Sequence, residues 1–433
     1  MKKINILVLI LIFIPISTYG DIYYSFLSDN TQTEMMKSDI NWVKVGEEYF
    51  IWSQNDYPNS KHTTKNLYLL KHKNPLDLSL EEVLFDKNGF AILLLEDGEY
   101  QGWKSKENAF IRIEEIPVNE VIYSKYISKE KPKSETDTET VETLIESLSQ
   151  QNYGDYLLGL TNFPTRYTYS ENFSNVTDWV EDRFTYMGYL PKLDLFEYNG
   201  NTYNNVIAQK IGSVSPDDWY IICGHYDSTS NDPMNNAPGG DDNGSGAAGV
   251  LETARVLKDI ETEASVLFIA FGAEEQGMIG SKAYVADLKK NGDLSKVKAV
   301  LNMDMIGYLN SGKWDILLEG EPVSEWMINI ISDTVTEYSL NLIVETSLIA
   351  WGSDHEPFLN EGVPAVLLIE HEYDENPNYH RTTDTYNTVT QPYAMEVLKM
   401  NIAALAAMNK FTLQAQPTPT QSLSINYSVW KLY

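Results

Sequence analysis

The segment Trp219-Tyr220-Ile221-Ile222-Cys223-Gly224-His225-Tyr226-Asp227 decides the fold. Its first five residues form a compact apolar run, which predicts a buried strand. Small residues with helical spacing follow at 246–259, and apolar runs then alternate with helical stretches as far as residue 410. The further expected strands are 266–271, 299–303, 316–318, 342–344 and 365–369, and the helices are 281–290, 322–338 and 393–410. This alternation predicts an α/β fold, a three-layer sandwich with a mostly parallel central sheet flanked by helices.

A small β-rich domain is predicted upstream of this sandwich. Residues 21–130 contain short apolar and aromatic runs separated by Asp, Asn, Gly and Pro, at 40–45, 49–52, 66–70 and 91–95. Residues 131–140 are polar and charged, as in an exposed linker. The main domain is expected at 141–412, opening with a short helix over 139–151, and an irregular tail at 413–433.

The first twenty residues have the pattern of a signal peptide. Lys2 and Lys3 precede an apolar run at 4–16, and small residues follow before Asp21. A membrane anchor is the alternative, but the run is shorter than the roughly 20 residues that span a bilayer. We therefore expect residues 1–20 to be removed, no stable membrane anchor afterwards, and a secreted or periplasmic protein.

The composition excludes several classes of function. The 433 residues include 62 acidic and 32 basic side chains, a net charge of −30. Phosphate neutralisation needs clustered Lys and Arg, so nucleic acid is not an expected partner. The single cysteine, Cys223, excludes an intramolecular disulfide and a cysteine-based zinc finger. The sequence does not indicate an oligomeric state.

Residues that commonly bind metals follow the expected strands of the main domain. In an extended chain His225 and Asp227 face the same side, and a carboxylate beside an imidazole can orient it as a ligand. Next, the glycine-rich stretch 238–246 carries Asp241 and Asp242 at the start of a helix. Alone, the first pattern is more typical of a surface turn, and the second fits a calcium loop or a helix N-terminus with favourable acids, although its spacing does not fit an EF-hand.

Three further segments add to this group. Glu274 and Glu275 follow an apolar strand and point in opposite directions, so that one can bind metal while the other faces a reacting water. Asp304 interrupts an apolar run, where a partner cation would offset the cost of burying a carboxylate. His380 follows the strand that ends near residue 369. Ligands of open α/β sheets gather at the carboxyl ends of strands. Two histidines and several carboxylates at this edge suit zinc, and a bridging carboxylate would suit two metals.

These segments resemble the co-catalytic zinc exopeptidase family that includes secreted bacterial leucyl aminopeptidases, aminopeptidase Y and glutamate carboxypeptidase II. The resemblance covers roughly residues 140–412 and matches the motifs in identity, order and spacing. It implies two zinc ions per chain, with Asp242 bridging them. The implied ligands are His225 and Asp304 on one side, and Glu275 and His380 on the other. It further implies Glu274 as the general base and Asp227 as the carboxylate behind His225.

The resemblance also implies a reaction. Two zinc ions activate a water and polarise the scissile carbonyl, while Glu274 moves the proton to the leaving amine. The acidic surroundings favour a substrate amine over a carboxylate, so we expect an aminopeptidase acting on peptides with a free N-terminus. Some bacterial members have a disulfide and an oxyanion-stabilising tyrosine where this chain has Ala350 and Trp351, so a zinc ion would act alone as electrophile. Met305, Trp351 and Tyr379 are candidates for an apolar pocket wall.

Two other functions remain open at this point. Glutaminyl cyclases resemble the same family and bind a single zinc, and some receptor ectodomains use the fold without catalysis. A third question concerns residues 21–130. Because secreted zinc peptidases are often made with a prosegment, these residues are predicted to be an inhibitory or folding-assisting prodomain, with a permanent accessory domain as the alternative.

Overall fold

The computed structural model describes most of the chain after the expected signal peptide. The described residues are 22–28, 41–45, 48–53, 61–63, 65–72, 83–87, 90–106, 111–116, 120–125, 136–309, 312–350, 352–371 and 373–413. The expected signal peptide (1–20), the first half of the expected linker and nearly all of the C-terminal tail lie outside these residues. Among the described helices, none combines the length and the apolar character that a membrane span requires.

The main domain contains eight strands of one sheet, in the order β10-β11-β14-β12-β15-β18-β16-β17. The strands are β10 (Lys192–Tyr198), β11 (Asn201–Lys210), β12 (Ser215–His225), β14 (Ala264–Phe271), β15 (Val297–Met303), β16 (Asp315–Glu319), β17 (Ile343–Ser347) and β18 (Ala365–Glu370). The four central strands, β14, β12, β15 and β18, are parallel to one another. Strands β10, β11 and β16 add antiparallel pairs at the two sides.

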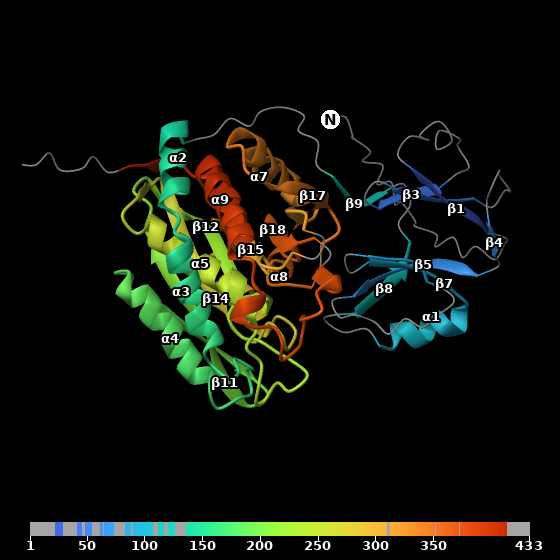
Figure 1. Ribbon diagram of the computed structural model, residues 1–433, viewed down its shortest axis with the longest axis horizontal. Helices are drawn as coiled ribbons and strands as arrows, with labels where there is room; N and C mark the ends of the chain where they lie inside the picture. The colour runs from blue at the N-terminus through green and yellow to red at the C-terminus, as the bar shows by residue number, and fades with distance from the viewer. Residues whose placement is uncertain are drawn as a thin grey trace, which may run out of the picture.

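Helices cover both faces of this sheet, as expected for a three-layer sandwich (Figure 1). One face packs against α2 (Thr138–Ser147), α3 (Gln150–Thr161), α4 (Phe173–Tyr186), α5 (Gly246–Leu257), α7 (Glu325–Glu337) and α9 (Gln391–Met408). The other face packs against α6 (Ile279–Asn291) and the short α8 (Glu356–Leu359). The predicted α/β architecture is therefore confirmed.

Two details of the main domain differ from the prediction. The single helix expected at 139–151 is two helices, α2 and α3, because Ser149 begins a new one: its hydroxyl accepts a hydrogen bond from the backbone N–H of Asn152. The segment between 162 and 214 also holds α4 and the hairpin β10–β11, which the prediction lacked. Only Phe196 of β10 and residues 205–208 of β11 are buried, so the hairpin has no clear apolar pattern.

The N-terminal region is β-rich, as predicted. Its described residues form two sets of strands and one short helix. The first has the strands β9 (Glu120–Lys125), β2 (Asn41–Val45), β3 (Glu48–Ser53), β1 (Ile22–Ser28) and β4 (Lys61–Thr63). The second has β6 (Val83–Lys87), β7 (Phe90–Leu95), β5 (Asn66–His72) and β8 (Ile111–Glu115), with α1 (Asp97–Lys104) beside it.

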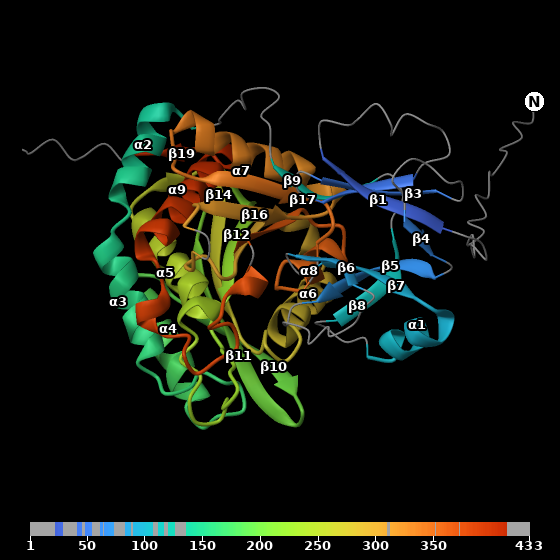
Figure 2. The ribbon, with the colours of Figure 1, turned by 45° about the vertical axis from the view of Figure 1, so that its right-hand side comes forward.

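The N-terminal region and the main domain share a sheet. Strand β9 pairs antiparallel with β17, so the two sets of strands form one sheet of thirteen (Figure 2). They also share an apolar cluster: Phe50, Leu69 and Ile92 belong to the same cluster as Leu367 and Ile369 of β18. The N-terminal region therefore covers the part of the sheet face that α6 and α8 leave open.

Candidate metal centre

The candidate site lies at the carboxyl edge of the parallel strands. His225 is the last residue of β12, Glu274 follows β14, and Asp304 follows β15 directly. These three strands are neighbours in the sheet, with β12 in the middle. Parallel strands end at the same edge, so residues far apart in the sequence meet there.

The five residues predicted as metal ligands form two groups that share Asp242. Nε2 of His225 lies 3.3 Å from Oδ1 of Asp242 and 3.2 Å from Oδ1 of Asp304. Nε2 of His380 lies 3.0 Å from Oδ2 of Asp242 and 3.2 Å from Oε2 of Glu275. Within each group the potential ligand atoms all lie within 4.8 Å of one another. The two oxygens of Asp242 thus face different groups, as a bridging ligand requires.

Glu274, the predicted general base, lies beside these groups without belonging to either. Its side chain is almost fully buried, and its Oε2 lies 3.9 Å from Nε2 of His225. Glu275, the next residue, faces His380 instead. The two adjacent carboxylates therefore serve different parts of the site, as the sequence suggested.

The carboxylate of Asp227 lies beside His225 and also contacts the turn that follows β14. Its carboxylate accepts hydrogen bonds from the backbone N–H groups of Glu274 (3.1 Å) and Glu275 (3.2 Å) and from the hydroxyl of Thr168. Nδ1 of His225 lies nearer to the backbone oxygen of Asp227 (3.2 Å) than to its Oδ1 (3.6 Å). The backbone carbonyl thus favours a proton on Nδ1 and leaves Nε2 for a metal, while the carboxylate orders the turn that carries the two glutamates.

Two residues hold the glycine-rich loop that presents Asp242. The carboxylate of Asp384 accepts hydrogen bonds from the backbone N–H groups of Asp241 (2.9 Å) and Asp242 (3.0 Å). The fully buried Arg166 donates to the carbonyl oxygens of Pro238 and Gly239. Gly239 has a φ of 52°, and a Cβ there would clash with the backbone oxygen of Asp242, so a larger residue would displace the loop.

Asp304 is oriented from its other side. The hydroxyl of Ser353 donates to Oδ2 of Asp304 at 2.7 Å, while Oδ1 faces His225. Asn302 in turn donates to the Ser353 hydroxyl at 2.8 Å. This bond fixes which oxygen of Asp304 is presented to the site.

The electrostatics of the site fit bound cations. Burial opposes protonation of His380, but Glu275 and Asp242 outweigh it and raise the His380 pKa to about 10. For His225 the facing carboxylates, Asp304 first, likewise outweigh burial and raise the pKa well above the usual value. Without a metal the carboxylates thus draw protons onto the imidazoles. Oε1 of Glu275 is buried and has no hydrogen-bond partner among the described residues. Nitrogen and oxygen ligands of this kind suit zinc.

A layer of acids lies directly behind the ligands. Burial raises the pKa of Asp241 to about 7. Burial and the nearby Asp241 also raise the pKa of Glu370 well above its usual value. Asn376 lies between them and donates to Oδ2 of Asp241 at 3.1 Å and to Oε1 of Glu370 at 3.4 Å. Protons shared within this layer would limit its charge next to the metal centre.

Of the three residues predicted to form an apolar pocket wall, the structure describes two. Met305 and Tyr379 are almost fully buried in the cluster shared with the N-terminal region. Trp351 lies outside the described residues. His355, to which the sequence assigned no role, is fully buried.

Sequence reasoning did not identify Arg166, Ser353 or Asp384 as supporting residues. Asp384 could have been found, since it lies four residues after His380 in the same segment. Arg166 had no comparable signal.

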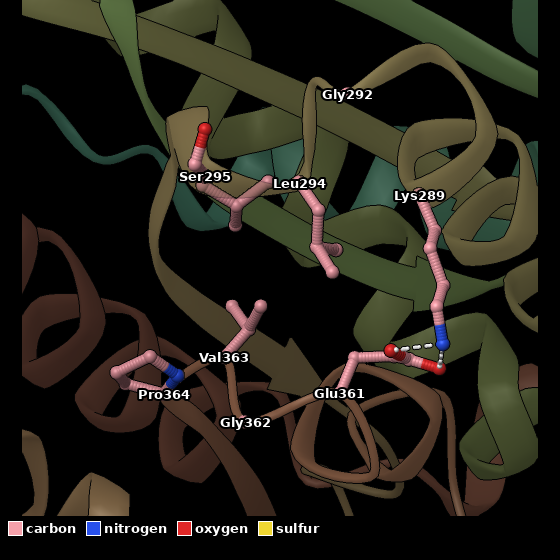
Figure 3. Close-up of a pocket in the computed structure, with 9 residues that line it drawn as sticks. Lys289, Gly292, Leu294, Ser295, Glu361, Gly362, Val363 and Pro364 are labelled. Carbon is pink, nitrogen blue, oxygen red and sulfur yellow. Dashed lines mark hydrogen bonds and ion pairs between the residues drawn. The ribbon is translucent and has the colours of Figure 1, made fainter.

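A separate cavity opens at the amino edge of the same sheet. Its volume is about 500 Å³, and it lies between the end of α6 and the residues before β15 and β18. In Figure 3 the side chains of Lys289 and Glu361 meet across its margin, forming an ion pair at 2.7 Å. None of the residues in either metal-ligand group lines this cavity.

Comparison with known proteins gives a consistent picture. Residues 205–406 match the description Peptidase family M28. Aminopeptidase YwaD of Bacillus subtilis is 33% identical over 212 residues, 46% of this chain and 43% of that protein. Leucine aminopeptidase 1 of Sclerotinia sclerotiorum is 27% identical over 330 residues, 70% of this chain and 83% of that protein.

Solved structures share the fold at low sequence identity. The aminopeptidase of Aneurinibacillus sp. strain AM-1 has a TM-score of 0.53 and 18% identity, covering 64% of this chain and 98% of that one. LapB of Legionella pneumophila has a TM-score of 0.57 and 21% identity, covering 90% of this chain and 99% of that one. A Bacteroides thetaiotaomicron glutaminyl cyclase has a TM-score of 0.51 and 16% identity, covering 60% and 98%.

Proposed function

From the membership of residues 205–406 in peptidase family M28, we infer that this metallo-aminopeptidase removes N-terminal residues from peptides with two zinc ions and Glu274 as general base. The observation that supports this most strongly is the pair of ligand groups joined by Asp242, with the buried Glu274 beside them. A single-metal enzyme would need only one such group.

Zinc, Glu274 and Asp227 have different roles in the proposed hydrolysis of the peptide bond. When bound, zinc lowers the pKa of a coordinated water and polarises the scissile carbonyl. The carboxylate of Glu274 accepts a proton from the attacking water. As the carbon–nitrogen bond breaks, it returns that proton to the departing amine, so the glutamate ends as it began. Asp227 keeps Glu274 in place through the backbone N–H bond.

The substrate preference follows from the charge of the site. His380 is the most exposed of the ligands, with 22% of its side chain accessible, so the side of Asp242 and Glu275 is the open one. A peptide entering there meets carboxylates, which attract a protonated α-amine and repel a C-terminal carboxylate. The arrangement supports cleavage next to a free N-terminus.

We also propose that the protein is exported. The basic start and the apolar run at 4–16 are the support for this. Expression of the full chain in a bacterial host, followed by N-terminal sequencing of the extracytoplasmic product, would test it; export requires a product that begins near Asp21.

The decisive test of the activity combines metal content with hydrolysis of leucyl-p-nitroanilide. Purified protein is expected to hold about two zinc ions per chain, to release nitroaniline, and to lose this activity on chelation and regain it with zinc. One zinc without hydrolysis, together with cyclisation of N-terminal glutamine peptides, would instead establish the glutaminyl cyclase. Protein that binds no zinc would overturn the proposal.

A further inference from the structure

An ion pair connects the N-terminal region to the surroundings of the metal centre. Nη2 of Arg112, on β8, lies 2.5 Å from Oε1 of Glu356, the first residue of α8. The Glu356 side chain is 5% exposed, while that of Arg112 is 38% exposed. A buried carboxylate of the main domain thus has its cationic partner in the N-terminal region.

Glu356 holds the turn that precedes it. Its second oxygen, Oε2, accepts a hydrogen bond from the backbone N–H of Gly352 at 2.8 Å. The backbone N–H of Glu356 donates to the carbonyl oxygen of Ser353 at 2.9 Å. The turn 352–356 is therefore closed on itself by Glu356, and Ser353 lies inside it.

Ser353 transmits this position to a metal ligand. Its hydroxyl donates to Oδ2 of Asp304 at 2.7 Å, and Oδ1 of Asp304 is the atom that faces His225. A continuous series of contacts thus runs from Arg112 through Glu356 and the turn to Asp304. Each contact is short, and each partner except Arg112 is buried.

Strand pairing and side-chain packing around this series of contacts join the N-terminal region to the main domain. Strand β9 extends the sheet beyond β17. Leu317, Leu367 and Ile369 of the main domain are almost fully buried within the cluster that includes N-terminal side chains.

We propose that the N-terminal region is a permanent part of the enzyme and that Arg112 is a positioning residue, which holds Asp304 in its ligand geometry through Glu356 and Ser353. This rests on the proposed function, both for the zinc that Asp304 would bind and for the catalytic readout. It selects the accessory-domain alternative over a removable prodomain.

The charge of Glu356 supports this arrangement. Burial favours the protonated form, but the N–H of Gly352 and the Arg112 guanidinium outweigh it and lower the Glu356 pKa. Removing the guanidinium would leave a buried carboxylate with weaker stabilisation, and the turn would lose a fixed anchor.

The test compares three variants of the full chain with the wild type: Arg112→Ala, Arg112→Lys and Glu114→Gln. Glu114 is the matched control. It lies two residues along the same strand, pairs with Lys71 within the N-terminal region at 2.9 Å, and is half exposed. The measurements are kcat and KM for leucyl-p-nitroanilide, and the rate at which a chelator removes zinc.

Residues that support ligands from outside the coordination sphere typically contribute about 10- to 100-fold in activity or metal affinity, and Arg112 is more distant than these. We expect Arg112→Ala to lower kcat about tenfold with little change in KM and to accelerate zinc loss. Arg112→Lys should recover most of both, and Glu114→Gln should change neither. Unchanged zinc loss in Arg112→Ala would overturn the proposal whether or not the wild type cleaves the substrate.

A second measurement addresses the prodomain. The mass of the active extracytoplasmic enzyme should include residues 21–130. Full activity in a form that lacks them would overturn the proposal. An inactive wild type that still shows the expected zinc kinetics would instead refute only the aminopeptidase activity.

Discussion

The two edges of the central sheet differ in how deeply their charged side chains are buried. At the carboxyl edge, His225, Asp304 and Glu274 are almost completely buried and face one another. At the amino edge, Lys289 and Glu361 form an ion pair whose side chains are 63% and 28% exposed. Water can solvate the second pair, but the first group needs hydrogen bonds and cations to offset its burial. The buried charged side chains therefore identify the carboxyl edge as the one that carries the candidate metal centre.

The largest expected effect is at the carboxyl edge. Glu274→Gln preserves shape but removes the proton acceptor, so kcat should fall by about 10²- to 10⁴-fold while the zinc content is retained. Kinetics and metal analysis on the same preparation would show this. Glu361→Gln makes the identical chemical change at the amino edge and should leave kcat and the zinc content unchanged. Near-normal turnover by Glu274→Gln would remove Glu274 from the mechanism.

Loss of one predicted ligand should remove zinc from one of the two ligand groups and leave the other group occupied. His380→Ala leaves the group of His225, Asp242 and Asp304 intact, so the zinc content should fall from about two to about one per chain. Activity should fall at least about a hundredfold, because a ligand matters more than the residues that support ligands. An enzyme that still binds two zinc ions would show that His380 is not a ligand.

The support of the glycine-rich loop should have a smaller effect. In Asp384→Asn only one oxygen remains to accept the N–H groups of Asp241 and Asp242, and the loss of one buried acceptor typically costs about 1–3 kcal/mol. We expect lower stability and weaker zinc binding, measured by denaturant unfolding and by competition with a chelator. Unaltered zinc affinity would limit Asp384 to a structural role.

The metal-free protein should respond to pH. Because the His380 pKa is raised from 6.5 to about 10 in the folded state, the folded protein holds a proton that the unfolded chain releases first. Its contribution to stability is complete below about pH 6.5 and disappears as the pH rises through about 10. Unfolding in the presence of a chelator should therefore become easier across this range. Zinc displaces the proton, so a calorimetric titration at neutral pH should record proton release.

The smallest effect should be at the amino edge. Lys289→Ala removes an exposed ion pair, which typically contributes about 0–1 kcal/mol. Thermal unfolding and leucyl-p-nitroanilide hydrolysis should both stay close to the wild type. A strong loss of activity would show that the two edges are coupled.

The sequence predicted what depends on local patterns. Apolar runs located β12, β14, β15 and β18, and the polar residues that follow them meet in the two groups that could hold metal ions. The β10–β11 hairpin was not predicted, because burial in β10 is limited to Phe196 and in β11 to residues 205–208, which leaves no clear alternation. The boundary between α2 and α3 depends on a single capping serine.

Features that depend on long-range contacts could not be predicted. Arg166 contacts backbone carbonyls more than 70 residues away, and no local pattern indicates such partners. The position of Asp227 behind His225 was predicted, but its contact with the turn after β14 was not. Its carboxylate binds the turn at Glu274 and Glu275, a choice that depends on how β12 and β14 end beside each other.

The pairing of β9 with β17 has a consequence for the behaviour of the chain in solution. Glu345 and Thr346 pair with Lys125 and Ser124, so the outer side of β17 is closed by a strand from the N-terminal region. An unpaired strand at this position would be a template on which another chain could add its own strand. The N-terminal region thus covers the edge of β17. A main domain without it would expose this edge and would tend to associate into dimers or aggregates through it.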